Sequence, residues 1–148
     1  MLEKTWEYND GGRSKYFKAE RVGDCVTRAI SIATGLDYKD VYDEINRRCK
    51  IDTVPKRAKT KSQGARSGVY RKTYDRYLKD LGWKWVPCMG IGTGCKVHLK
   101  KSELPSGTII CRLSRHLTAV IDGVVNDTYD CTREGTRCVY GYYVKNEK

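Results

Sequence analysis

Residues 114–127 read Ser-Arg-His-Leu-Thr-Ala-Val-Ile-Asp-Gly-Val-Val-Asn-Asp, and this stretch decides the fold expected for the C-terminal half of the chain. Two apolar, β-branched runs flank an Asp-Gly pair, which is a strong signal for a hairpin with a two-residue turn. Such a turn sets Ile121 opposite Val124 and brings His116 and Asp127 to one face of the sheet, as diagonal neighbours. We therefore predict a hairpin that carries a histidine within reach of a carboxylate.

A second register is also compatible with this stretch. A three-residue loop would shift the pairing by one residue, and Asn126 rather than Asp127 would then lie beside His116. The sequence leaves both partners open.

The rest of the chain divides into a helical front and a strand-rich back. Helices are predicted at 25–34, with Asp24 as N-cap and Gly35 as the stop, at 38–49 after an Asp37 cap, and at 69–81. Strands are predicted at 83–86, 108–113, 116–121, 124–129 and 138–144. Helices followed by strands predict an α+β fold, with N-terminal helices packed on an antiparallel β-sheet. The 148 residues are expected to form a single domain, 1–148.

Cys25 lies in the sequence Gly-Asp-Cys-Val-Thr-Arg-Ala-Ile, residues 23–30, at the predicted start of the first helix. A helix N-terminus favours anions and so stabilises a thiolate over a thiol. The charge of Asp24 raises the thiol pKa unless helix capping compensates it. A cysteine on an apolar helix face is usually a small core residue, so this position alone does not identify a nucleophile.

The order of these residues along the chain resembles the papain-like cysteine peptidase superfamily: a cysteine at a helix start, a strand histidine, then Asp or Asn on the next strand. Within it, the chain looks most like the small papain-like proteins of phages and prophages, and like the bacteriocin-leader peptidase branch. The resemblance covers most of the chain and includes the segments 8–13, 23–25, 81–83, 94–98, 116–120 and 135–140.

The resemblance implies a papain-like fold and a cysteine hydrolase of the peptidase, isopeptidase or acyltransferase type that needs no cofactor. It implies that Cys25 is the nucleophile, His116 the general base and Asp127 the residue that orients the imidazole. Its substrate would be a peptide or protein.

The chain departs from this pattern at the oxyanion hole. Papain-like enzymes usually place a Gln shortly before the nucleophile, whereas residues 16–21 read Tyr-Phe-Lys-Ala-Glu-Arg. The backbone N–H of Cys25 remains a donor, and Asn9 is the nearest upstream amide that could be a second. Loss of one donor costs roughly 10² to 10³ in rate, so a catalytically degenerate protein is the alternative.

A basic segment suggests what such a degenerate protein would bind. The formal net charge is +11, and a loop at about 50–67 is rich in Lys and Arg. The candidate binding patch consists of Lys56, Arg57, Lys59, Lys61, Arg66, Arg71 and Lys72. It could engage nucleic acid or an acidic host protein, with Tyr70 and Tyr74 to stack on bases; solvated loop charge and a lid over the Cys25 cleft are the other interpretations.

The cysteine content and the N-terminal sequence indicate in which cellular compartment the protein is expected. The chain has seven cysteines, no long apolar run and no signal-peptide pattern at its start, so we expect reduced thiols, no membrane contact and a cytoplasmic location in a bacterial host cell. Cys88 and Cys95, like Cys131 and Cys138, are too widely spaced for a structural zinc knuckle, and no metal site is predicted. We interpret these cysteines as buried or incidental thiols, with an exposed pair prone to oxidation, and His98 as structural.

Overall fold

The computed structural model describes residues 4–18, 23–52, 63–90 and 92–146. Over these residues six strands form one sheet in the order β1-β5-β4-β3-β6-β2. The strands are β1 (Trp6–Tyr8), β2 (Trp83–Pro87), β3 (Thr108–Leu113), β4 (His116–Ile121), β5 (Val124–Asp127) and β6 (Gly141–Lys145). The helices are α1 (Arg13–Tyr16), α2 (Cys25–Thr34), α3 (Tyr38–Ile51) and α4 (Arg71–Asp80), with a 3-10 turn at Lys101–Glu103.

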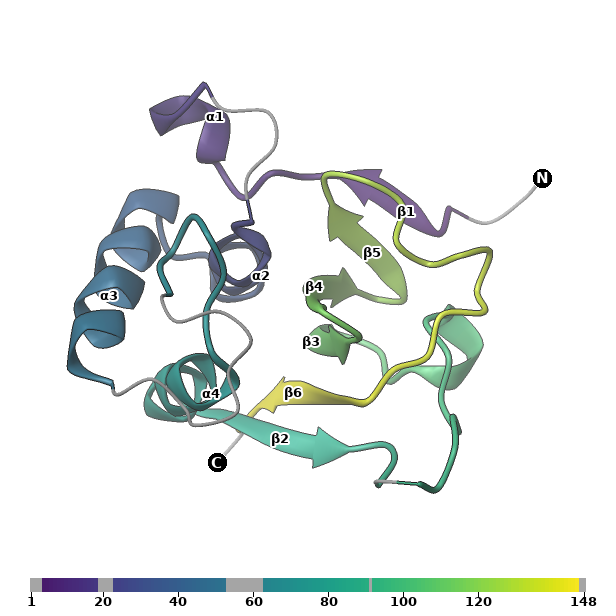
Figure 1. Ribbon diagram of the computed structural model, residues 1–148. Helices are drawn as coiled ribbons and strands as arrows, with labels where there is room; N and C mark the ends of the chain where they lie inside the picture. Colours follow the sequence, from purple (N-terminus) through teal and green to yellow (C-terminus); the bar gives the residue numbers. More distant parts are fainter. Residues whose placement is uncertain (1–3, 19–22, 53–62, 91, 147–148) are drawn as a thin grey trace.

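The helices α2, α3 and α4 lie together on one side of the sheet, with α2 nearest to β4 (Figure 1). Neighbouring strands are antiparallel, except that β1 runs parallel to β5. This arrangement confirms the predicted α+β class, with helices packed on a mostly antiparallel sheet. None of the described helices has the length and apolar character needed to cross a membrane.

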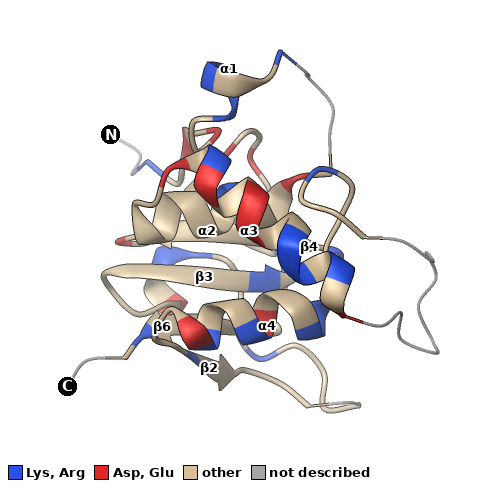
Figure 2. Cartoon of the chain, turned by 90° about the vertical axis from the view of Figure 1, so that its left-hand side faces the viewer, with Lys and Arg blue, Asp and Glu red and all other residues tan. Residues whose placement is uncertain are grey.

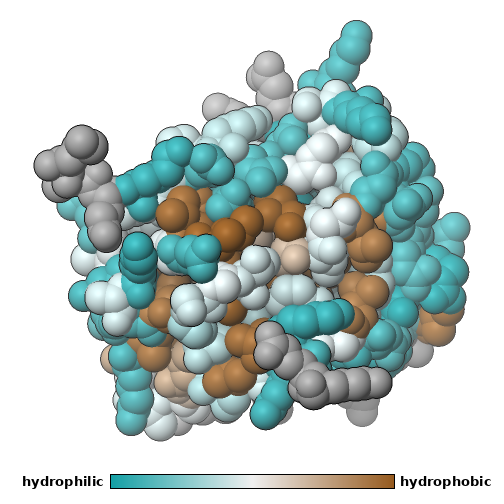
Figure 3. Space-filling view, turned by 180° about the vertical axis from the view of Figure 1, so that it is seen from behind, coloured by the Kyte–Doolittle hydropathy of each residue, from teal (hydrophilic) through white to brown (hydrophobic). Residues whose placement is uncertain are grey.

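Two apolar layers cover the two faces of the sheet. Because successive strand residues point to opposite faces, Ile110 of β3 packs with the helices while Ile109 and Cys111 pack on the other side. The helical layer is completed by Ile30 of α2 and Leu78 of α4, both fully buried. On the face seen from behind, apolar side chains form separate areas among hydrophilic ones (Figure 3).

The hairpin between β4 and β5 has the predicted two-residue turn. Ile121 pairs with Val124, and Asp122 and Gly123 both have positive φ, at 48° and 80°. Positive φ at both central residues is the geometry that matches the right-handed twist of the flanking strands, and Asp-Gly adopts it readily. The register is therefore the one that places Asp127 rather than Asn126 on the face of His116, and the three-residue alternative is wrong.

Several boundaries differ from the prediction. The helix predicted at 69–81 is α4, which begins at Arg71. The strand β5 ends at Asp127, and β6 begins at Gly141. Two N-terminal elements, β1 and α1, were not predicted, since three or four residues carry too little periodicity to identify. The predicted loop at about 50–67 falls largely on residues 53–62, which lie outside the described residues.

The expectation of fully reduced thiols is contradicted, because Cys95 and Cys138 form a disulfide. The cause is a non-local backbone contact: the Val139 N–H donates to the Val97 carbonyl at 2.8 Å, and His98 and Cys138 form an isolated bridge. These contacts hold the two Cα atoms 5.8 Å apart, within the usual range for a disulfide.

Candidate active site

Helix α2 presents Cys25 as its first residue, half-buried at the edge of a pocket. The helix ends at Gly35, which has a φ of 77° that a glycine adopts without strain. The pocket has a volume of about 280 Å³ and is lined by residues of α2, β3, β4 and the start of α4. His116, the first residue of β4, also lines it. The fold thus brings the cysteine and the histidine to one pocket from distant parts of the chain.

His116 is held by Asp127 across the hairpin. The His116 Nε2 atom lies 2.6 Å from Asp127 Oδ2, and the Asp127 carboxylate is 2% exposed. The Thr118 hydroxyl donates to Oδ2 at 2.7 Å, the Thr128 N–H donates to Oδ1 at 2.7 Å, and the Arg28 guanidinium donates to Oδ1 at 3.1 Å. Burial opposes ionisation of Asp127, but the hydrogen bond and charge of His116 outweigh it and lower the pKa of Asp127 to about 2.

The environment of Cys25 favours its thiolate. Burial raises the pKa of the thiol, but the hydrogen bond and charge of His116, the backbone N–H of Leu117 and the charge of Arg28 together bring this pKa below its ordinary value. Burial acts against the charged form of His116 as well, yet Asp127, Cys131 and Cys25 raise the pKa of the imidazole. Since Nε2 faces Asp127, Nδ1 is the ring nitrogen that is left for Cys25. These mutual shifts favour a thiolate paired with an imidazolium, and Asp127 binds the Nε2 side of that ring.

Asp24 does not cap α2, contrary to the prediction. Its carboxylate is fully buried, accepts hydrogen bonds from Arg13 at 3.0 Å and from the Tyr38 hydroxyl at 2.6 Å, and also pairs with Arg28. Two guanidinium groups therefore compensate the negative charge next to Cys25. The ion pair at Cys25 can form without the cap.

Arg28 was missed by the sequence reasoning. One of its amino groups pairs with Asp24, and the other donates to Asp127. The signal was present, because residues four apart on a helix lie on the same face, and Asp24 and Arg28 have this spacing. What the sequence does not show is that the same guanidinium reaches Asp127 on β5.

The two asparagines considered earlier take no part in this site. The Asn9 amide donates to Asn126 Oδ1 at 3.1 Å, and Asn9 Oδ1 accepts the Gly11 N–H, so Asn9 stabilises a turn instead of lining the described pocket. Asn126 also donates to the Val124 carbonyl and lies on the opposite face from His116. Asn9 as an oxyanion donor and Asn126 as the orienting residue are therefore wrong.

Unlike the two asparagines, Tyr74 of α4 lines the pocket, and its side chain carries a hydroxyl group. Its side chain is 6% exposed, and burial, together with the nearby charge of Cys25, raises the pKa of its phenol against the opposing charges of Arg112 and Arg71. The sequence placed Tyr74 on a helix face and as a base-stacking residue, but not beside Cys25.

A second thiol, Cys131, adjoins the His116–Asp127 pair. Cys131 Sγ lies 3.7 Å from Asp127 Oδ2, and the ligand atoms of His116, Asp127 and Cys131 all lie within 4.8 Å of one another. Two ligands of a tetrahedral zinc ion lie about 3.3 Å apart, given zinc bonds of about 2.0 Å. The 2.6 Å between His116 and Asp127 is the length of a hydrogen bond instead. The cluster has the geometry of a hydrogen-bonded network, and in the described part of the chain it is the one such group of potential ligands.

The described residues of the candidate basic patch, Arg66, Arg71 and Lys72, lie in different environments. The Arg66 guanidinium lies over the Phe17 ring, and the Arg71 guanidinium lies over the Trp85 ring and lines the Cys25 pocket. Lys72 is exposed on α4, where blue and red residues alternate along the helix (Figure 2). Lys56, Arg57, Lys59 and Lys61 lie outside the described residues.

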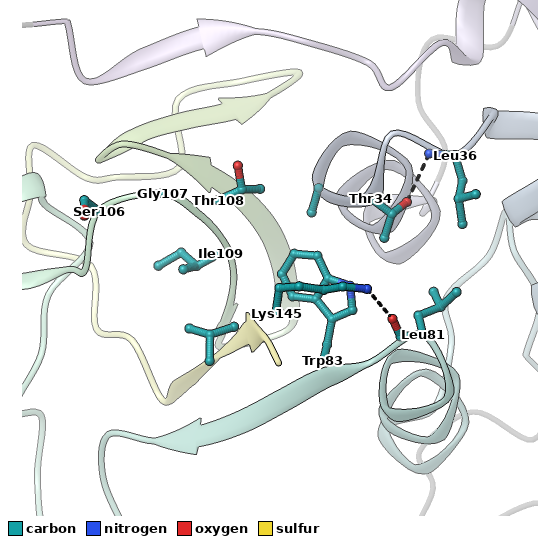
Figure 4. Close-up of a pocket in the computed structure, with 11 residues that line it drawn as sticks. Thr34, Leu36, Leu81, Trp83, Ser106, Gly107, Thr108, Ile109 and Lys145 are labelled. Carbon is teal, nitrogen blue, oxygen red and sulfur yellow. Dashed lines mark hydrogen bonds between the residues drawn. The ribbon is translucent and has the colours of Figure 1, made fainter. Parts of the chain in front are cut away.

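A larger cavity, of about 520 Å³, lies elsewhere, between α2, the end of α4 and the sheet. Trp83 and Ile109 line it, and Lys145 crosses it to donate to the Leu81 carbonyl at 2.6 Å (Figure 4). No cysteine, histidine or carboxylate is among its described lining residues. His98, the second histidine, hydrogen-bonds to Glu103 at 3.2 Å and is not among the described residues that line the Cys25 pocket.

Comparison of the chain with protein-family models, curated proteins and solved structures gave no match in any of the three.

Proposed function

We propose that the chain is a thiol hydrolase or acyltransferase of the papain-like type that acts on a peptide or isopeptide bond. Cys25 is its nucleophile, His116 its general acid and base, and Asp127 the residue that orients the imidazole. The observation that carries the proposal is that Cys25 and His116 line one pocket, with Asp127 2.6 Å from Nε2 of His116, while His116 lowers the pKa of the thiol and Cys25 helps to raise the pKa of the imidazole. The order Cys, His, Asp along the sequence, which resembles that superfamily, supports it.

The reaction proceeds in two acyl transfers. The Cys25 thiolate attacks the substrate carbonyl, a C–S bond forms, and the imidazolium Nδ1–H of His116 protonates the departing amine as the C–N bond breaks. Neutral His116 then takes a proton from water, which attacks the thioester and releases the acid and the thiolate. An amine in place of water gives acyl transfer.

The oxyanion of each tetrahedral intermediate needs donors near the sulfur. The backbone N–H of Cys25, at the first turn of α2, is one. We assign the second to the Tyr74 hydroxyl, because Tyr74 lines the pocket with Cys25 and is close enough for the two groups to influence each other's charge. This takes the place of the glutamine that the sequence lacks.

Acylation can be tested with p-nitrophenyl acetate, since a nucleophilic thiol releases nitrophenolate in a burst before deacylation limits turnover. We expect a burst near one equivalent per chain that is lost in Cys25→Ala. The matched control is Cys49→Ala, because Cys49 is also half-buried but its pKa is raised to about 11 by burial. A burst of the same size in folded Cys25→Ala would overturn the assignment.

A further inference from the structure

The pocket at Cys25 carries an unusual set of charges. Three arginines line it: Arg71 at the start of α4, Arg112 near the end of β3, and Arg115 in the turn that leads to His116. No Asp or Glu is among its described lining residues. Within the described lining of the pocket, the positive charge therefore has no acidic counterpart.

None of these three arginines forms an ion pair with any described carboxylate. Other described arginines are paired with carboxylates, as Arg48 is with Glu44 and Asp80, although Arg66, Arg133 and Arg137 are not. Two of them lie over aromatic rings instead. The Arg71 guanidinium is 5.1 Å from the centre of the Trp85 ring, and the Arg112 guanidinium is 5.5 Å from the centre of the Tyr140 ring. Such stacking positions a guanidinium and leaves its edge available to bind an anion. Arg112 also lies close enough to the Tyr74 hydroxyl to act on the pKa of that phenol.

The third arginine, Arg115, lies in the turn between β3 and β4. Arg115 has a φ of 55°, in the left-handed region that a glycine would occupy without strain. On the other side of His116, a second hollow is lined by Arg115, Arg133 and Arg137, with Asp130 as its one described acidic residue. The Asp130 carboxylate accepts the N–H and the hydroxyl of Thr132. Positive charge thus continues past the histidine.

We propose that the substrate of Cys25 is an acidic peptide, with Asp or Glu side chains next to the bond that reacts. Arginine binds carboxylates through paired N–H groups, and unpaired arginines at a pocket mouth attract anions and repel cationic peptides. Cleavage of such a peptide rests on the proposed function. The preference of the pocket for anions is independent of that function, because it can be measured by alkylation of the Cys25 thiol.

Iodoacetate and iodoacetamide test this preference, because both alkylate a thiolate with loss of iodide and they differ mainly in charge. We expect the rate ratio of iodoacetate to iodoacetamide at Cys25 to exceed that of glutathione, and to fall at least threefold in Arg71→Gln and Arg112→Gln, roughly as expected for removing one nearby charge. The ratio cancels any change in the thiol pKa. Arg47→Gln, an exposed arginine paired with Glu44 on α3, is the control and should leave the ratio unchanged.

Peptides extend the test to the substrate. A short glutamate-rich peptide should protect Cys25 from iodoacetamide and be cleaved faster than its glutamine counterpart, and Arg112→Gln should remove both effects. Equal cleavage of the two peptides, with an unchanged alkylation ratio in the arginine variants, would overturn the acidic substrate and leave the hydrolase standing. An intact charge preference with no cleavage of any peptide would support the anion site and count against the hydrolase. Protection by a single-stranded oligonucleotide but not by the glutamate peptide would overturn the proposal in favour of nucleic acid.

Discussion

At the scale of single residues, the free cysteines differ sharply in their acidity. Burial raises the pKa of Cys49, Cys88 and Cys111, whereas the pKa of Cys25 is lowered by His116 despite its burial. The difference arises from one neighbour, His116, which lowers the pKa of Cys25 and is itself held by Asp127. A buried thiol without such a neighbour is an inert core residue.

Tyr74→Phe should separate the thiolate from the oxyanion donor. Alkylation by iodoacetamide passes through no oxyanion, so its rate at Cys25 should stay within about twofold of wild type, whereas acylation by p-nitrophenyl acetate should fall roughly 10²-fold. Tyr77→Phe, also buried on α4 but outside the described lining of the pocket, is the control and should change neither rate. Equal losses in both reactions would show that Tyr74 acts through packing rather than through its hydroxyl.

At the scale of elements, α2 joins two charged networks that meet at Arg28. Asp24 at its start is buried with Arg13, Arg28 and Tyr38, and Arg28 continues to Asp127 on β5. The helix is thereby fixed to the hairpin by ion pairs as well as by the apolar face that it packs on the sheet. This fixes the position of Cys25 relative to His116.

Arg28→Met should therefore cost about 3 to 5 kcal/mol in the free energy of unfolding, because it leaves two buried carboxylates short of a partner. It should also raise the pKa of Cys25, since the charge of Arg28 helps to lower it. Urea denaturation measures the first effect, and the pH dependence of alkylation the second. Arg47→Gln removes an exposed pair and should cost less than about 1 kcal/mol; equal costs for the two variants would contradict this account of α2.

At the scale of the whole molecule, local and non-local features differed in how well the sequence predicted them. The start of α2 and the Asp122-Gly123 turn are local signals, and they were enough to place Cys25 at a helix start and His116 on the face of Asp127. The strand β1 pairs with β5 at the opposite end of the chain. Local periodicity does not contain such a pairing, and β1 was missed.

The same limit applies to the surroundings of the site. Tyr74 reaches the pocket because α4 packs on α3 and β2 and shares a core cluster with α2, and the contact of Arg28 with Asp127 depends on how α2 lies against the hairpin. Asp24 had the right position for a cap, but the buried guanidinium groups of Arg13 and Arg28 bind its carboxylate instead. Each of these features depends on tertiary packing, which overrides the local preference.

The disulfide between Cys95 and Cys138 cross-links two distant segments of the chain and closes a long loop. Cys95 and Cys138 are separated by 43 residues, so the chain-entropy relation gives about 4 kcal/mol of stabilisation. The Cys95→Ser/Cys138→Ser variant should lose about this much in urea denaturation, and its Cys25 alkylation rate should be unchanged because neither residue is among the described lining of the Cys25 pocket. A stability unchanged by the substitution would contradict a constraining bond.

The most direct test of the central claim is the pH dependence of Cys25 alkylation by iodoacetamide, followed by peptide mapping. Because the pKa of Cys25 is lowered, its thiolate should persist below the ordinary thiol pKa of about 8.5, and the alkylation rate should fall at a lower pH than it does for an ordinary thiol. In His116→Gln the burial of the thiol is no longer opposed by the imidazole, so the profile should move upward by more than one pH unit, roughly the size of one strong charge partner. His98→Gln, the change at the other histidine, should leave the profile in place. A wild-type profile that follows an ordinary thiol and is unchanged in His116→Gln would contradict the thiolate–imidazolium pair and the function built on it.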